Sequence, residues 1–318
     1  MTAYIIRRTW QSLIVLVLVT FIVFLAMRLL PGDPILIFIS NTQLEETPLE
    51  EINRLRHEFG LDKPLLQQYI NWLYDVVRGD LGVSIIQRTP VIEQIKIRLP
   101  ITLHLSLVAF ILSFILGLPL GIIAATRRGT KLDSVVTILA NIGITVPIFW
   151  LGVIMIYFFA LYLGWLPVHG YTSPFIDLKQ SIRQMIMPVI CLTVFPLASI
   201  SRQTRSSMLE VMRQDYIRTA WAKGLAERVV ILKHALKNAT IPVITLAGLS
   251  LSHVVGGSVL IETVFNIPGM GRALVMSVFG HDYTMVQGFV LIIAIFVLVV
   301  NFLVDISYGW IDPRIRYE

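Results

Sequence analysis

Six long apolar runs constrain this chain more than any other feature of its sequence. A helix needs about 20 mostly apolar residues to cross the roughly 30 Å of hydrocarbon in a bilayer. The composition agrees, because 56% of the residues are hydrophobic and only 14% are charged, against about 25% charged in soluble domains. The sequence therefore predicts an all-α integral membrane protein with six transmembrane helices. The runs cover residues 10–30, 101–125, 134–166, 185–201, 241–261 and 285–304.

The third run cannot be one straight crossing. Its 33 residues, 134–166, are too many for a single perpendicular helix and too few for two spans with a turn between them. Gly143 and Pro147 lie near its middle, and proline removes a backbone donor and clashes with the preceding turn. We therefore expect one helix that is bent or broken near Gly143 or Pro147.

The basic residues indicate which side of the membrane each loop faces. An Arg-Arg pair at 7–8 precedes the first run, three more Lys and Arg residues lie within 127–131, and eight lie within 202–238. The tail 308–318 adds two on the same side. Because short cytoplasmic loops are enriched in Lys and Arg, we expect both termini to be cytoplasmic (N-in, C-in). This topology accounts for the net charge of +6 without a nucleic acid as partner.

The outer segment, residues 31–99, has a helical pattern of its own. Asp62 can cap a helix that has Pro64 in its first turn, and apolar residues recur at helical spacing as far as Val76. A second short helix is expected after Pro90. Two interpretations stay open for this segment: a small cap packed on the outer face of the membrane, or a docking platform for an extracellular partner.

The loop 202–238 contains a short amphipathic helix that Asp215 can cap. Arg218 and Lys223 lie largely off its apolar face, and Gly224 sits near its end. Such a helix can lie on anionic headgroups or insert into a groove of a cytoplasmic partner. The pattern alone leaves both possibilities open. The apolar face consists of Tyr216, Ile217, Ala220, Trp221 and Leu225.

Signatures of catalysis and metal binding are absent from the sequence. It has no G-x-x-x-x-G-K-[ST] phosphate loop, no H-E-x-x-H and no G-x-S-x-G. Its six His residues form no pair at ligand spacing on one helix. His253 lies within the fifth run but without a buried carboxylate partner, which favours helix packing over a proton relay. We expect no catalytic residues and no metal site in this chain.

Several sequence blocks occur in an order and spacing that resemble one family along nearly the whole chain. They read L-L-P-G-D-P at 29–34, R-G-D-L-G-V-S at 78–84, P-I-F-W-L-G at 147–152, T-R-S-S-M-L-E-V at 204–211 and D-Y-I-R-T-A at 215–220. The chain resembles the membrane permease subunit of peptide-type ABC importers, the dipeptide, oligopeptide and nickel group.

This resemblance implies a coupling helix that fits a groove of an ATPase subunit. Against the family pattern E-A-A, three residues, G, the chain has Arg218 and Thr219 at the first two positions, Ala220 at the third and Gly224 at the glycine. The contacts of the generic glutamate therefore cannot be carried over. Ala220 and Gly224 are small and would let another surface approach, while aromatic rings often anchor interfaces. The implied helix contains Asp215, Tyr216, Ile217, Arg218, Thr219, Ala220, Trp221, Lys223, Gly224 and Leu225.

The resemblance also implies a type I ABC importer permease fold in a bacterial cytoplasmic (inner) membrane. The partners would be a homologous second permease, two ABC ATPase subunits that bind ATP and Mg²⁺, and an extracytoplasmic solute-binding protein, with no cofactor in this chain. Peptides are the expected solute, and nickel or a metal chelate is the alternative. A secondary transporter or channel without ATPase partners is the competing class. The implied parts are an N-terminal transmembrane helix (1–30), the extracytoplasmic segment (31–99), a five-helix permease core (100–307) with the coupling loop (202–238), and a cytoplasmic tail (308–318).

Polar residues in the middle spans are the candidates for lining the translocation path. Neutral polar walls can exchange hydrogen bonds with a passing peptide without holding it. The same residues could instead form hydrogen bonds between helices, as small polar residues in membrane spans commonly do. The candidates are Asn141, Thr145, Ser250 and His253.

Overall fold

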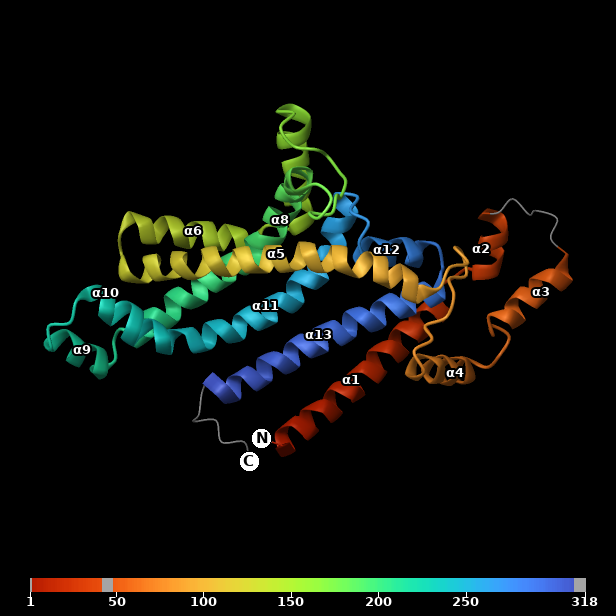
Figure 1. The fold of residues 1–318 in the computed structure, drawn as a ribbon, viewed down its shortest axis with the longest axis horizontal. Helices are drawn as coiled ribbons and strands as arrows, with labels where there is room; N and C mark the ends of the chain where they lie inside the picture. The colour runs from red at the N-terminus through yellow and green to blue at the C-terminus, as the bar shows by residue number, and fades with distance from the viewer. Residues whose placement is uncertain (1, 42–47, 312–318) are drawn as a thin grey trace. The chain divides into compact units, whose positions relative to one another are not determined.

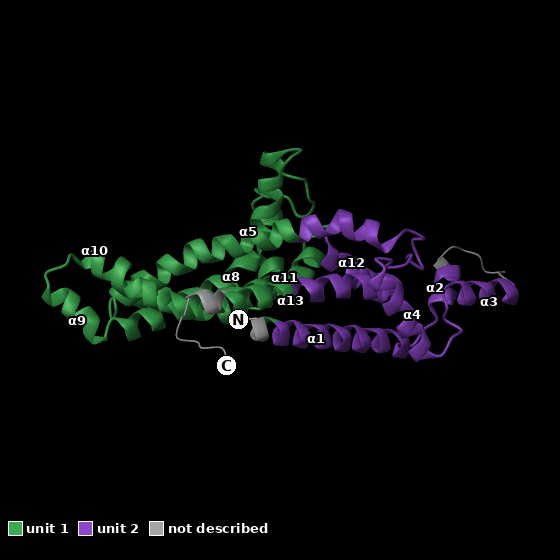
Figure 2. Cartoon of the chain, turned by 60° about the horizontal axis from the view of Figure 1, so that its bottom comes forward, with its two compact units in different colours: residues 1–5, 103–267, 299–318 green, residues 6–102, 268–298 purple. Residues whose placement is uncertain are grey.

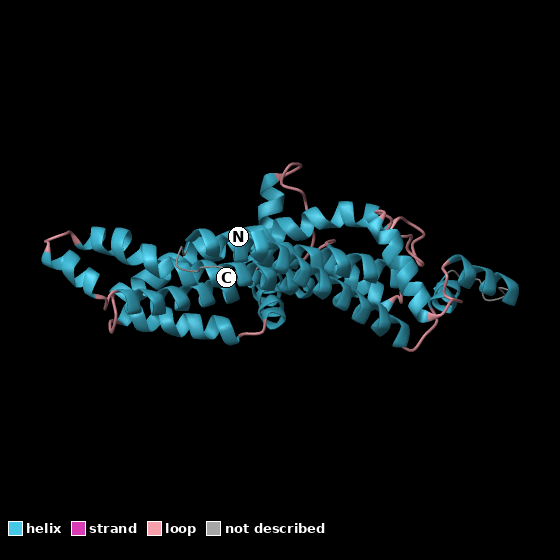
Figure 3. Cartoon of the chain, turned by 90° about the horizontal axis from the view of Figure 1, so that it is seen from below, coloured by secondary structure: helices cyan, strands magenta, loops and turns pink. Residues whose placement is uncertain are grey.

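The computed structural model describes residues 2–41 and 48–311, and its regular elements there are all helical (Figures 1 and 3). A single isolated antiparallel bridge joins Val83 and Pro90. The elements are α1 (Thr2–Leu29), α2 (Pro34–Asn41), α3 (Leu49–Glu58), α4 (Leu65–Val77), α5 (Val91–Thr126), α6 (Lys131–Thr145), α7 (Ile148–Met155), the π-helix η1 (Ile156–Tyr162), α8 (Leu178–Val211), α9 (Asp215–Ala222), α10 (Glu227–Val229), the π-helix η2 (Val230–Ala235), α11 (Leu236–Val264), α12 (Met270–Phe279) and α13 (Tyr283–Ile311).

Five stretches of helix in the described part are long and apolar enough to cross a membrane, and the pair α6–α7/η1 makes a sixth when it counts as one broken span. This agrees with the six runs read from the sequence and confirms an all-α membrane protein. The five are Ile5–Leu29, Val91–Thr126, Leu178–Val211, Glu227–Val264 and Tyr283–Ile306.

The third span is bent by 102° where α6 meets α7. Val146, the residue before Pro147, is extended (φ −71°, ψ 123°), as expected because a proline disfavours the helical conformation of its predecessor. The predicted break is thus confirmed at Pro147. Gly143 remains helical and buried instead, and an ideal Cβ there would lie 3.1 Å from side-chain atoms of Val194 and Ala198 on α8.

One predicted helix boundary was wrong. The short helix expected after Pro90 is the beginning of α5, which continues without a break through Pro100 for 36 residues, so the boundary expected between residues 99 and 100 falls inside one helix. α8 likewise runs for 34 residues through Pro188 and Pro196. A proline inside a helix removes one hydrogen bond, and in a membrane span neighbouring groups make up that loss.

Asp62 also does not cap α4. Pro64 occupies the N-cap position, and the Asp62 carboxylate lies 2.7 Å from His57 Nδ1. This hydrogen bond holds the pKa of Asp62 below its usual value. Asp62 therefore closes the turn between α3 and α4 rather than the first turn of α4.

The chain forms two compact units, each built from segments that are distant in the sequence (Figure 2). Unit 1 comprises residues 1–5, 103–267 and 299–318, and unit 2 comprises residues 6–102 and 268–298. The sequence division at 31 and 100 does not separate them, because unit 2 combines the outer segment with α12 and parts of α1, α5 and α13.

Unit 1 is organised around α8, which packs against α6, α7 and α11. Small residues also bring α5 close to α8. An ideal Cβ on Gly117 would lie 2.9 Å from the carbonyl oxygen of Leu197, and one on Gly121 would lie 2.5 Å from that of Ser201. Glycines four residues apart that let two backbones approach are typical of helix pairs in membranes.

Unit 2 is held together by buried polar contacts as well as apolar ones. Tyr69 of α4 donates a hydrogen bond to the carbonyl of Val17 (3.1 Å), and its hydroxyl lies 3.0 Å from Thr20 Oγ1 on α1. The buried Asp282 carboxylate accepts hydrogen bonds from the Ser84 hydroxyl and from the backbone N–H groups of Ile85 and Met285. Asp282 thus fixes the loop before α5 to the first turn of α13.

Candidate functional site

Helix α9 is fixed to unit 1 by its own buried side chains. Ile217 and Ala220 are 1% and 6% exposed and pack into an apolar cluster supplied by α5, α8, η2 and α11. α9 therefore rests on the ends of three long helices, next to α10 (Figure 1). The other members of the cluster are Ala125, Met208, Val230, Ala235 and Ala239.

The end of α9 requires a glycine. Gly224 has φ +73°, its N–H donates to the carbonyl of Trp221 (2.9 Å), and the N–H of Leu225 donates to the carbonyl of Ala220 (3.4 Å). These two bonds form a Schellman motif, in which the residue after the C-cap adopts the left-handed conformation. An ideal Cβ on Gly224 would have no heavy atom of the described residues within 4 Å. Glycine is therefore needed at this position for its left-handed backbone conformation, and not because neighbouring atoms leave no room for a side chain.

The outward face of α9 combines aromatic rings with cations. Tyr216 and Trp221 are each 43% exposed, and the Tyr216 hydroxyl accepts a hydrogen bond from Asn238 Nδ2 (2.7 Å). Arg218 and Lys223 are exposed beside them. Among the described residues, Arg218 forms an ion pair with Asp215 (3.3 Å), whose side chain is even more exposed than that of Arg218. This face has aromatic anchors and positive charge of the kind that interfaces use.

Three details of the sequence-based description of α9 were wrong. The apolar residues of α9 do not share one face. Ile217 and Ala220 are buried against the rest of the chain, whereas Tyr216 and Trp221 are exposed. Ala220 is therefore not available for another protein to approach. Asp215 is the first residue of the helix, and Gln214 occupies the N-cap position. Periodicity identifies a face but not the part of the same chain that covers it.

A buried ion pair near this site was missed by the sequence reasoning. Arg205 of α8 donates from Nε and Nη2 to the two carboxylate oxygens of Asp133 (2.7 and 3.0 Å). Asp133 also accepts from the backbone N–H of Gly129 (3.0 Å) and from Thr137 Oγ1 (3.3 Å). The sequence signal that could have indicated this pair is Asp133, a single acidic residue in the otherwise basic stretch 127–133. The pair joins the start of α6 to α8.

The four path candidates divide into exposed and buried residues. Asn141 and Thr145 are exposed on α6, and Thr145 Oγ1 donates to the carbonyl of Asn141 (3.1 Å). His253 is exposed on α11. Ser250 is only 3% exposed, and its hydroxyl donates to the carbonyl of Leu246 (2.7 Å). Ser250 is thus buried, but its hydroxyl bonds within α11 and not to a neighbouring helix as the alternative interpretation required.

His253 and the break between α6 and α7 share one pocket of about 240 Å³. Val146 and Ile148 line it on either side of Pro147, and Phe195 lies with its ring centroid 5.9 Å from that of His253. The structure therefore brings His253 next to the bend that follows Thr145.

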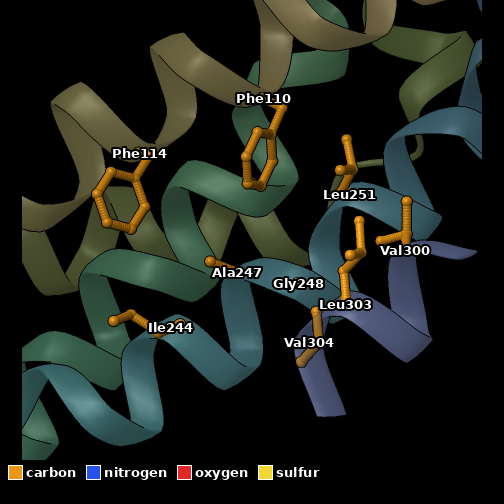
Figure 4. Close-up of a pocket in the computed structure, with 9 residues that line it drawn as sticks. All are labelled: Phe110, Phe114, Ile244, Ala247, Gly248, Leu251, Val300, Leu303 and Val304. Carbon is orange, nitrogen blue, oxygen red and sulfur yellow. The ribbon is translucent and has the colours of Figure 1, made fainter. Parts of the chain in front are cut away.

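A second pocket of about 370 Å³ in unit 1 is entirely apolar (Figure 4). Phe110 and Phe114 of α5 form one wall, α11 supplies the floor, and Val300, Leu303 and Val304 of α13 close it. It offers no polar group that could orient a peptide.

Comparison with protein families decides the class of this chain. Residues 117–317 match the family described as "Binding-protein-dependent transport system inner membrane component". Residues 1–108 match the N-terminal region of such membrane components. The chain belongs to this family. This inner-membrane transport component therefore lies in a bacterial cytoplasmic membrane.

Relatives that align with this transport component over their full length include two peptide permeases. It is 40% identical to the oligopeptide transport system permease protein AppB of Bacillus subtilis over 320 residues, and 38% identical to the dipeptide transport system permease protein DppB of Escherichia coli over 341 residues. Each alignment covers 100% of both chains.

The fold of this transport component is similar to that of a solved importer. One chain of the inward-facing MetNI methionine ABC transporter matches with a TM-score of 0.56 and 23% identity, covering 67% of this chain and 93% of that one. This likeness confirms the type I ABC importer permease fold.

Proposed function

We propose that this chain is a translocation subunit of an ATP-driven importer of di- and oligopeptides. The observation that carries the proposal is full-length identity of about 40% to the peptide permeases AppB and DppB. The chain supplies the membrane path, and hydrolysis of ATP takes place in separate subunits that bind ATP and Mg²⁺.

In this proposal α9 is the element that contacts an ATPase. Its exposed Tyr216 and Trp221 enter a groove of that subunit, and Arg218 and Lys223 pair with acidic groups at the rim. The burial of Ile217 and Ala220 supports it, because a helix fixed to the ends of α5, α8 and α11 passes its displacement to the spans.

The remaining parts of the assembly follow from this placement. Two ATPases, a homologous second permease and an extracytoplasmic binding protein complete the complex. Both termini and α9 lie in the cytoplasm, and residues 31–99 face the binding protein. The solute crosses near Asn141, Thr145 and His253, beside the bend at Pro147, while Ser250 packs behind them. The complex alternates between inward-facing and outward-facing states.

The test is peptide-stimulated ATP hydrolysis by the complete complex in lipid nanodiscs. Tyr216→Ala combined with Trp221→Ala should abolish the stimulation and reduce copurification of the ATPase. Trp165→Ala is the control, because Trp165 is an equally large exposed aromatic outside the coupling loop (63% exposed). Normal stimulation in the double variant would contradict the role of α9, and peptide uptake without ATP would contradict the function itself.

A further inference from the structure

Unit 2 contains a polar pocket of about 400 Å³ that the proposed function does not use. It is lined by α1, α4, the first turns of α13 and the loops between α3 and α5. The lining residues that matter are Arg28, Gln68, Trp72, Asp75 and Gln287.

Three N–H donors on the walls of this pocket have no acceptor among the described residues. They are Nη1 of Arg28, Nε1 of Trp72 and Nε2 of Gln287. Gln287 is only 4% exposed. Buried donors without a partner are uncommon, and each one calls for an explanation. Three on one pocket point to a ligand that is rich in acceptor oxygens.

Arg28 is held in place but not neutralised. Its Nε donates to Gln68 Oε1 (3.1 Å), and its guanidinium lies 4.4 Å from the ring centroids of Phe24 and Tyr283. Gln68 is itself fixed, because its Nε2 donates to the carbonyls of Leu61 and Lys63. Within the described part of the chain Arg28 forms no ion pair, so its charge is available to an anion.

The same pocket also has an anionic side. Asp75 lines it and is exposed, and no ion pair of its carboxylate occurs among the described residues. A pocket that is lined by fixed N–H donors, a cation and a carboxylate suits a zwitterion.

The pocket lies near the ends of two candidate membrane spans. Arg28 is next to the end of the span Ile5–Leu29, and Gln287 is near the start of the span Tyr283–Ile306. α4 packs against α1 through Tyr69, which reaches Val17 well inside the first span. Another face of α4 carries an exposed apolar stripe of the kind that enters the headgroup region: Leu66, Ile70, Tyr74 and Val77.

We propose that this pocket binds the headgroup of a zwitterionic phospholipid with a primary ammonium, such as phosphatidylethanolamine. The phosphate oxygens accept hydrogen bonds from Arg28, Trp72 and Gln287, and the ammonium lies near Asp75. The three nitrogens are covered in the structure, so the headgroup reaches them only when side chains that line the pocket rotate aside. The location near the ends of two candidate membrane spans favours a lipid over a dipeptide, which is also a zwitterion.

The experiment measures lipids retained by the purified complex in native mass spectrometry. We expect Arg28→Gln and Trp72→Phe, the second of which removes the indole N–H but keeps a smaller aromatic ring, to reduce retained phosphatidylethanolamine about tenfold. Arg78→Gln is the matched control, because Arg78 stacks on Tyr74 (4.0 Å) outside the pocket. Equal retention in all three variants would overturn the proposal.

Two further arms identify the ligand. Asp75→Asn should shift the retained lipid from phosphatidylethanolamine towards phosphatidylglycerol, because the carboxylate no longer attracts an ammonium or repels an anion. Neither millimolar inorganic phosphate nor a dipeptide mixture should displace the lipid. Displacement by phosphate would show a simple anion site, and displacement by dipeptides would show a solute site. Either result would overturn the assignment to a phospholipid and leave the proposed transport function intact.

Discussion

Arg205 donates two hydrogen bonds to the buried carboxylate of Asp133, which joins α8 to the first turn of α6. The Asp133 side chain is 8% exposed and that of Arg205 is 29% exposed. Four hydrogen bonds converge on this one carboxylate. The first turn of α6, the helix before the bend at Pro147, is therefore fixed to α8, the central helix of unit 1.

Asp133→Ala should destabilise the protein by about 3 kcal/mol, because it leaves the Arg205 guanidinium partly buried without its anion. The measurement is the unfolding midpoint in detergent micelles. Thr137→Ala, which removes only the weakest of the four bonds (3.3 Å), is the control. The double variant Asp133→Ala with Arg205→Ala should lose less stability than the sum of the two single variants. Strict additivity would show that the pair has no interaction of its own.

Gly224→Val should cost about 1–2 kcal/mol locally, because residues with a Cβ pay that much in the left-handed conformation. Gly224→Asn should cost less, since Asn tolerates this conformation. Peptide-stimulated ATP hydrolysis should follow the same order: glycine, then Asn, then Val. If Asn and Val impaired coupling equally, the requirement would be for a small surface and not for the backbone conformation.

Gly121→Ala should destabilise unit 1 by about 1–3 kcal/mol, because the new Cβ would lie 2.5 Å from the Ser201 carbonyl oxygen and from Thr204 Cβ. Gly256→Ala is the matched control. It lies in α11, and the ideal Cβ there has no heavy atom of the described residues within 4 Å. The control should be neutral or stabilising by up to about 1 kcal/mol. Thermal unfolding of both variants in the same detergent distinguishes close packing from helix propensity.

The complex without its binding protein should show no high-affinity peptide binding by calorimetry. The pocket at His253 has about 240 Å³ and walls that are mostly apolar, so it offers a passing peptide few hydrogen bonds. A submicromolar Kd that His253→Ala abolished would place a specificity site in this chain.

The sequence was sufficient to locate the membrane spans, but it did not predict which helix surfaces pack against one another. Apolar runs locate helices because a membrane span must be apolar whatever it packs against. Pro147 was a correct candidate for the bend, whereas Pro100, Pro188 and Pro196 lie inside continuous helices. Whether a proline bends a helix depends on whether neighbouring groups compensate for the lost hydrogen bond. A local sequence pattern contains no information about those neighbours.

The candidate site shows the same limit. Helical periodicity placed Ala220 and Trp221 on one face of α9, and the fold buries the first and exposes the second. Asp133 and Arg205 are 72 residues apart, so neither indicates the other in a single sequence. The resemblance to a family pointed to residues 215–225 as the candidate site, and only the fold assigned each of their side chains to the interior or to the surface.

The contact at Gly117 and Gly121 makes α8 and the adjoining part of α5 a stiff lever. Two backbones in direct contact leave no layer of side chains that could deform between them, so they tilt together and do not slide. α8 has 34 residues and is therefore about 51 Å long. A tilt of about 10° applied near α9 would move the far end of such a rod by about 9 Å. A small displacement at α9 would thereby be amplified at the far end of α8 into a movement large enough to open a passage for a peptide.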